Sequence, residues 1–335
     1  MRILYFDLNC SGDFFESYSC NPKRYGGGGA FARWAKEILN KNNNIFKIIA
    51  PRQCFNELQD WENKDSCQPI EDLNFFKIIK SGYPIDKLIN GLENFDIICS
   101  HDVSNFINKG DLKIPVVSWN PFGSAEISHP YNDYCLCYNH KATKKYDHQP
   151  IKYIKIGKPI PKEFANIEKK DFIFQCTHHC KDFNTNEVAQ NCLKYGIKGY
   201  FAGPIHDNYN LMDFIDNKTT FYLGEISEEE KLKYTKEARM YTLCLDCDIP
   251  FNLSAIEANS LGTPILASRR GWLKEYIKDG VNGFFYDGNN FLNMYNETKN
   301  INQKECWESA KQYSVEEMIQ SFYNAFSEIK NEFKT

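Results

Sequence analysis

The sequence contains no apolar run near 18 residues and no large excess of either charge. The first absence argues against a membrane-spanning helix. Forty Lys and Arg residues against 44 Asp and Glu residues give a formal net charge of -4, so charge-driven binding to bulk nucleic acid or anionic lipid is not indicated. The amino terminus also lacks the long apolar segment and cleavage site of a signal peptide. We therefore expect a cytoplasmic protein, either free or peripheral to a membrane.

Regular cysteine pairing and internal repeats are also missing. The 13 cysteines are an odd number and are scattered along the chain, unlike the framework of a secreted disulfide scaffold. We expect reduced and mostly buried thiols. A composition of 42% hydrophobic and 25% charged residues is typical of folded globular proteins, and 335 residues predict two domains.

Strand-like and helical segments alternate along the chain, which is typical of a parallel α/β sheet. A Pro-containing, charged stretch at 158–170 interrupts the alternation and reads as a linker. The sequence therefore predicts an α/β fold of two facing Rossmann-like domains with a cleft between them, at 1–157 and 171–313, followed by a helix at 314–335. The predicted strands are 2–7, 45–50, 94–100, 114–119, 134–138 and 151–156 in the first half, and 171–175, 199–202, 220–223, 242–245, 264–267 and 283–286 in the second, with a helix at 228–241.

The most informative segment, 248–265, has the order loop, helix, strand. Asn252 precedes a helical run, and Gly262 and Pro264 mark its end. The backbone at the start of that helix offers free N–H groups and the positive end of a helix dipole, which suit a diphosphate. Glu257 lies one turn further in and could accept hydrogen bonds from two adjacent hydroxyls. The alternative is that Glu257 is a solvated helix residue.

These elements resemble the C-terminal half of the retaining, two-Rossmann-domain glycosyltransferases of family four, the glycosyl transferases group 1. The resemblance rests on the order and spacing of Phe-Tyr-Leu-Gly-Glu-Ile-Ser at 221–227, Pro-Phe at 250–251, Glu-Ala at 257–258, Gly-Thr-Pro at 262–264, Glu275, and Asp-Gly-Val-Asn-Gly-Phe at 279–284. The first half is compatible with that family but far less distinctive.

The resemblance implies transfer of a sugar from a UDP- or GDP-sugar to an acceptor hydroxyl, with retention of anomeric configuration. It implies a donor-binding domain at 171–313, an acceptor-side domain at 1–157, and neither a metal nor another cofactor. Protein cations and helix N-termini would then stabilise the leaving diphosphate. Residue by residue, Lys181 matches a lysine of the catalytic site, and the donor-binding positions are Gly27, Gly28, Phe251, Asn252, Leu253 and Glu257.

The first half contributes further candidates near predicted strand ends. His101 could orient an acceptor hydroxyl or stabilise positive charge on the donor sugar, or it could simply cap a loop. Asn120 and His129 are acceptor-side candidates, although His129 also fits a turn.

Three departures from the family pattern affect the donor site. Ile249 stands where the family often has Glu, Cys176 where it tends to have Arg, and Asn252 where it usually has Gly. Two local patterns could instead suggest metals: Cys-Thr-His-His-Cys at 176–180 and Asp-Cys-Asp at 246–248. The first is too short to wrap one zinc and has no second ligand pair nearby in the sequence. The second fits any acidic pair two positions apart, and the surrounding pattern resembles the metal-independent family, so we discount both.

The expected function is a retaining, metal-independent glycosyltransferase with a nucleotide-sugar donor. A glycan, a lipid-linked sugar, a protein and a modified base remain open as acceptors, as does a homo-oligomer. The first alternative is a catalytically silent relative that binds sugar nucleotides or serves as a partner subunit. The second is a sugar-nucleotide epimerase or hydrolase of the same fold.

Overall fold

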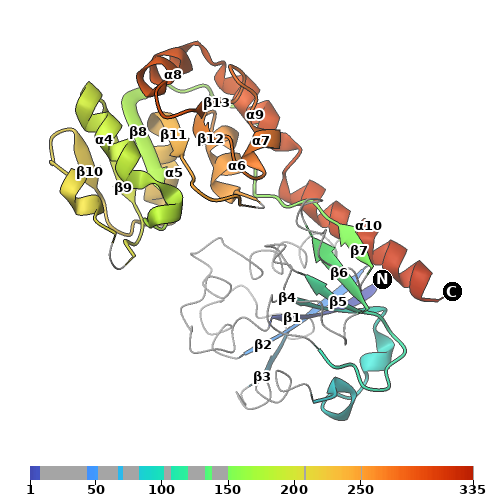
Figure 1. Cartoon of the computed structure of the whole chain (residues 1–335). Coiled ribbons are helices and arrows are strands. Elements are labelled where there is room, and N and C mark those ends of the chain that lie inside the picture. The colour runs from blue at the N-terminus through green and yellow to red at the C-terminus, as the bar shows by residue number, and fades with distance from the viewer. Residues whose placement is uncertain are drawn as a thin grey trace. The chain divides into compact units, whose positions relative to one another are not determined.

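The computed structural model describes residues 1–7, 44–51, 67–70, 83–101, 107–119, 133–137, 150–206, 209–249 and 251–334. The chain forms two compact units, the first made of Met1–Ile156 with Val315–Thr335 and the second of Gly157–Ser314. Each unit contains one parallel β-sheet (Figure 1). The predicted α/β class, with two parallel-sheet domains, is confirmed.

The first unit contains a seven-stranded sheet in the order β3-β2-β1-β4-β5-β6-β7. Side chains of β1 alternate between its faces, so Ile3 and Tyr5 enter one core and Leu4 enters the other. The Leu4 core includes Ile85 and Leu92, which lie in short 3-10 helices, η3 (Ile85–Lys87) and η4 (Leu92–Asn94). The strands are β1 (Arg2–Asp7), β2 (Ile45–Pro51), β3 (Cys67–Ile70), β4 (Ile97–His101), β5 (Val116–Trp119), β6 (Tyr134–Cys137) and β7 (Ile151–Tyr153).

The last helix, α10 (Val315–Phe333), belongs to the first unit. Its apolar residues recur at helical spacing and enter the core that contains Ile3 and Tyr5. Phe322 meets Trp119 of β5 edge to face, with 5.1 Å between ring centroids. The segment expected as a separate helix at 314–335 therefore completes the hydrophobic core of the first domain.

The second unit contains a six-stranded sheet in the order β10-β9-β8-β11-β12-β13. All its pairings are parallel, and the strand order reverses direction between β8 and β11. Its strands are β8 (Lys170–Cys176), β9 (Lys198–Ala202), β10 (Thr220–Tyr222), β11 (Ala238–Leu243), β12 (Ile265–Ser268) and β13 (Gly283–Tyr286).

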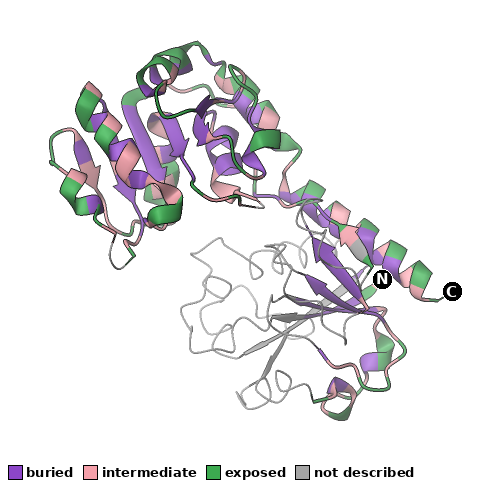
Figure 2. Cartoon of the chain, viewed as in Figure 1, coloured by how far each residue is buried: buried purple, intermediate pink, exposed green. Residues whose placement is uncertain are grey.

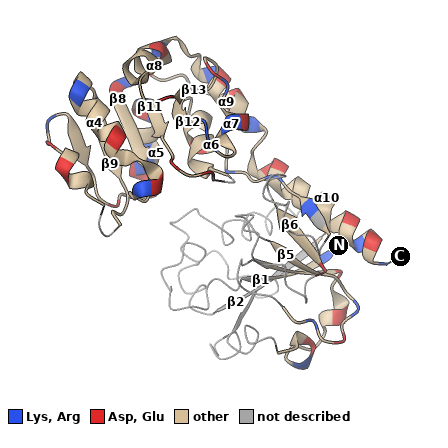
Figure 3. Cartoon of the chain, in the orientation of Figure 1, with Lys and Arg blue, Asp and Glu red and all other residues tan. Residues whose placement is uncertain are grey.

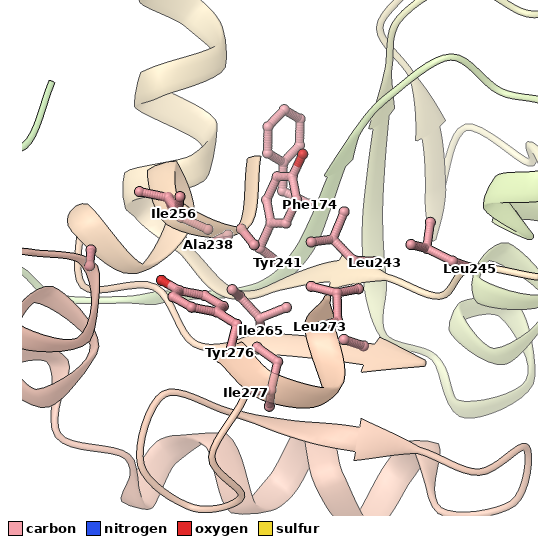
Figure 4. Packing of buried hydrophobic residues seen from close by; sticks show 14 of the residues in the cluster. Phe174, Ala238, Tyr241, Leu243, Leu245, Ile256, Ile265, Leu273, Tyr276 and Ile277 are labelled. Carbon is pink, nitrogen blue, oxygen red and sulfur yellow. The ribbon is translucent and has the colours of Figure 1, made fainter. Parts of the chain in front are cut away.

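Helices cover both faces of this second sheet, and the strands between them are largely buried (Figure 2). One face packs against residues of α5 (Glu228–Glu237), α6 (Leu253–Ser260), α7 (Leu273–Tyr276) and α9 (Gln303–Lys311), and Figure 4 shows part of this core. The other face packs against α4 (Thr185–Tyr195) and α8 (Phe291–Glu297). Three 3-10 helices join these elements: η6 (Lys181–Phe183), η7 (Leu211–Phe214) and η8 (Thr298–Asn300).

Two expectations about the second half need correction. The helix predicted at 228–241 ends at Glu237, and the next residues form β11, because this strand is buried between β8 and β12 and carries no alternating polar pattern. The expected linker, 158–170, packs on the second unit: Trp307 Nε1 donates to the Pro161 carbonyl at 2.9 Å, and Gln303 Nε2 donates to the Ile167 carbonyl at 2.7 Å.

No helix in the described ranges is both long enough and apolar enough to cross a membrane.

Candidate functional site

The site is built at the carboxyl edge of the second sheet, where the strand order reverses between β8 and β11. In open α/β sheets the loops that follow the two strands at such a reversal diverge and leave a place for a ligand. The loop after β8 leads into η6, and the loop after β11 leads into α6. The Asp246 amide donates to the Asp182 carbonyl at 2.8 Å, which joins the two loops.

The start of α6 has the predicted geometry. Asn252 is the N-cap, and its side chain accepts a hydrogen bond from the Ala255 amide at 2.9 Å. The other amides of the first turn have no intrahelical acceptor and carry the positive end of the helix dipole. The Phe251 ring packs on Trp272, with 4.4 Å between centroids, which fixes the approach to the helix. Gly262 ends this segment at φ 71°, as its sequence position predicted.

Glu257 lies one turn into α6 and is only 7% exposed. Its carboxylate forms ion pairs with two lysines: Lys158, which is equally buried, and Lys231 of α5, whose Nζ lies 2.9 Å from Oε1. Lys231 also pairs with Glu228 at 2.7 Å. The interpretation of Glu257 as a solvated helix residue is therefore wrong.

The charges of this buried cluster stabilise one another. Burial alone would raise the pKa of Glu257, but the ammonium groups of Lys158 and Lys231 offset it and hold this pKa below its ordinary value. Burial would lower the pKa of Lys231, yet Glu257 and Glu228 raise it to about 12. Glu257 and Lys231 are therefore both charged at neutral pH.

The sequence did not predict the two lysines of this cluster. Lys158 lies 99 positions before Glu257 in the chain, within the segment expected to be a linker, and no local pattern marks it. Lys231 had a weak signal, because the capping box of Ser227 and Glu230 fixes the start of α5 and puts Lys231 in its first turn.

The other end of the site is formed by the residues after β8. Lys181 begins η6 and has an exposed side chain. His178 lies beside His206, with 3.3 Å between Nδ1 and Nε2. His179 is fully buried, and its Nδ1 lies 3.0 Å from Thr185 Oγ1. The structure brings Lys181 and the start of α6 to the same edge of the sheet.

The positions that depart from the family pattern have defined surroundings. The Cys176 amide and carbonyl both bond to the Tyr241 hydroxyl, and burial raises the pKa of the Cys176 thiol to about 11, so it supplies no charge. Ile249 packs in the core of the second unit, and its carbonyl accepts from the Trp272 amide at 3.1 Å. Asp248 accepts from the Gly271 amide at 2.5 Å and lies 3.7 Å from Lys274, which ties together the loops after β11 and β12.

The candidates in the first half are only partly described. The backbone of His101 ends β4 and pairs with Asp7 and Trp119, at the point where the first sheet reverses its strand order. Gly27, Gly28, Asn120 and His129 lie outside the described residues. Their roles stay predictions.

In the described part of the chain, no three His, Cys, Asp or Glu side chains are grouped so that they could hold a metal ion. The residues at 176–180 and at 246–248, all of them described, form no such group.

Comparison with known proteins gives a match for the region that contains Glu257. Residues 194–305 match the model of the family Glycosyl transferases group 1. This region runs from the end of α4 to the start of α9 and contains β9 to β13. No curated protein matches the chain in sequence.

Several solved glycosyltransferase structures are similar over the whole chain. AviGT4, involved in avilamycin A biosynthesis, is 13% identical and has a TM-score of 0.67, with 99% of this chain and 98% of that chain covered. HepE of Anabaena, in complex with UDP, is 12% identical with a TM-score of 0.64, and the coverage is 98% and 100%. Sucrose-phosphate synthase of Thermosynechococcus elongatus is 12% identical with a TM-score of 0.67, and the coverage is 98% and 99%. At such identities the similarity establishes the two-domain glycosyltransferase fold, GT-B.

Proposed function

We propose that the protein is a retaining glycosyltransferase that transfers a sugar from a UDP- or GDP-sugar to an acceptor hydroxyl without a metal ion. The observation that carries the proposal is the capped start of α6 at the strand-order reversal, within the segment that matches the Glycosyl transferases group 1 model. HepE of Anabaena supports it further, because that protein has been crystallised with UDP and with UDP-glucose.

In this proposal, the second unit binds the donor. The backbone N–H groups at the start of α6 donate hydrogen bonds to the diphosphate, and Lys181, exposed after β8, supplies positive charge to the leaving group. Glu257, one turn into α6, is proposed to hold the ribose of the donor. A ribose would share the carboxylate with Lys158 and Lys231, which already donate to it.

The acceptor is deprotonated in a front-face reaction in which the leaving phosphate itself helps to remove the proton. Such a reaction relies on positioning more than on a strong protein base. His101, Asn120 and His129 are proposed to face the acceptor, which is a glycan, a lipid-linked sugar, a protein or a modified base.

A thermal-shift panel with UDP, GDP, ADP and their sugar conjugates tests the donor site, with EDTA present and absent. A ligand that binds only the native protein raises its melting temperature. We expect a chelator-insensitive shift for either the UDP or the GDP series. A shift that disappears with EDTA would contradict metal independence, and no shift with any nucleotide would contradict the donor site.

One observation favours a second candidate, a catalytically silent protein that binds sugar nucleotides. Both carboxylate oxygens of Glu257 are engaged by lysines, and Cys176 supplies no cation where the family tends to have Arg. Incubation with the stabilising nucleotide sugar and a mixture of acceptors separates the two functions. Nucleotide release that rises with acceptor supports transfer, whereas binding without release supports the silent protein.

A further inference from the structure

The second unit has a pocket at the amino edge of its sheet, away from the carboxyl edge where the candidate donor site lies. The pocket has a volume of about 610 Å³ and is lined by the start of β8, the turn before β9, the end of α5 and Tyr295 of α8. A volume of this size is typical of small-molecule sites. The two ends of β8 are separated by about 20 Å, at roughly 3.3 Å per residue, so this pocket is distinct from the candidate donor site.

Aromatic rings line part of this pocket, which we call the amino-edge pocket. Phe172, Tyr200 and Tyr234 line it, and the Tyr200 and Tyr234 ring centroids lie 5.4 Å apart. The Tyr200 ring also stacks on the Phe221 ring, with 4.9 Å between centroids. Both tyrosines are half-buried. Aromatic rings that pack on one another therefore line the pocket.

Charged groups of both signs surround these rings, and Figure 3 shows Lys and acidic residues on α5. Asp171 is fixed by Arg239 at 2.7 Å and by the Tyr295 hydroxyl at 3.0 Å, yet its side chain is 72% exposed. Glu237 pairs with Lys170 at 2.7 Å. The rim thus offers oriented carboxylate acceptors next to ammonium donors.

We propose that the amino-edge pocket is a secondary carbohydrate-binding site that takes part of an oligosaccharide. A sugar ring has an apolar face of C–H groups, which suits the faces of Tyr200 and Tyr234. Its edge carries hydroxyls that both donate and accept, which suits carboxylates and lysines placed side by side. A purely apolar ligand would cover the charged groups of the rim without replacing their hydrogen bonds to water. The proposal is independent of the donor site, because the two share no residue.

Calorimetric titration of the full chain with maltotetraose, cellotetraose, chitotetraose and a hyaluronan tetrasaccharide tests the pocket. We expect at least one of them to bind with millimolar affinity. Asp171→Asn should weaken that binding about tenfold or more, because a hydrogen bond to a charged acceptor is lost. Tyr234→Leu, which keeps an apolar side chain but removes the ring face, should weaken it similarly, and Tyr234→Phe should weaken it less.

Asp213→Asn is the matched control, since Asp213 is an exposed acid of η7 outside the pocket. It should bind the oligosaccharide as the wild type does. UDP titrations of the same proteins report on the donor site separately and should be unchanged by all four substitutions. The proposal is overturned if none of the four oligosaccharides binds, or if Asp171→Asn and Tyr234→Leu bind as tightly as Asp213→Asn.

Discussion

Replacing Glu257 by methionine is expected to destabilise the second unit strongly, because it removes the partner of a buried cation. Lys158 is 6% exposed, and Glu257 is its ion-pair partner in the described structure. Removing one member of a buried pair typically costs about 3–5 kcal/mol. The substitution costs less at Lys231, because this side chain is more exposed and still forms an ion pair with Glu228 at 2.7 Å. We therefore expect Glu257→Met to lower the free energy of unfolding by about 3–5 kcal/mol.

Two more variants, Lys158→Met and the double variant Glu257→Met with Lys158→Met, measure the contribution of the ion pair itself. Lys158→Met should cost less than Glu257→Met, because Glu257 retains Lys231 at 2.9 Å. The double variant should recover about 1–3 kcal/mol relative to the sum of the single changes, as residues in direct contact do in double-mutant cycles. An apolar pair of similar volume leaves no buried charge without a partner.

Urea denaturation followed by circular dichroism measures the stability of all four proteins. Because the chain has two units, unfolding need not be a single transition, and hydrogen exchange of peptides from α6 and β11 locates the loss. A cost below about 1 kcal/mol for Glu257→Met, the usual value of a solvent-exposed pair, would refute the burial argument. Strictly additive single and double variants would refute the pairing.

Three further predictions test other parts of the second unit. Lys181→Ala should leave the melting temperature nearly unchanged, because the side chain is exposed, while nucleotide-sugar turnover falls; full turnover would remove Lys181 from the proposed site. Gly203→Ala should destabilise the protein more than Gly196→Ala, although both glycines have a positive φ. An added Cβ at Gly203 would lie 2.1 Å from the Thr177 carbonyl oxygen, whereas one at Gly196 would meet nothing within 4 Å. Equal melting temperatures of the two variants would contradict the steric argument. Burial lowers the pKa of His179 from 6.5 to about 4. As the pH drops from 6.5 towards 4, the imidazole is therefore protonated in the unfolded chain before it is protonated in the folded one, and the free energy of unfolding should fall. His179→Asn, measured by melting temperature across that range, should flatten this part of the profile, and an unchanged slope would assign it to other groups.

Short sequence patterns predicted the helix and strand ends that are determined by a few adjacent residues. The start of α6 followed from Asn252 and its end from Gly262, because a cap and a positive-φ position are properties of a few adjacent residues. β13 was predicted with its observed bounds, Gly283–Tyr286. β11 was partly assigned to the preceding helix, since a strand buried on both faces has no polar alternation to distinguish it.

Contacts between distant segments could not be predicted from the same signals. Glu257 was recognised as a site residue, but its burial by Lys158 depends on a segment 99 positions away. From the sequence alone, an alanine at Glu257 would be expected to spare the fold, and the burial of the pair reverses that expectation. The amino-edge pocket was missed for the same reason, because its rings come from β8, β9 and α5.

The placement of α10 has a consequence for how the protein is made. The first unit covers one face of its sheet with residues such as Phe322 and Phe326, which the ribosome adds only after the whole second unit. The second unit, Gly157–Ser314, is continuous in the chain and can close its core during synthesis. The α10 residues of this core reach the first sheet only after the second unit has been synthesised, so we expect a chain truncated before Val315 to aggregate more readily than the full chain.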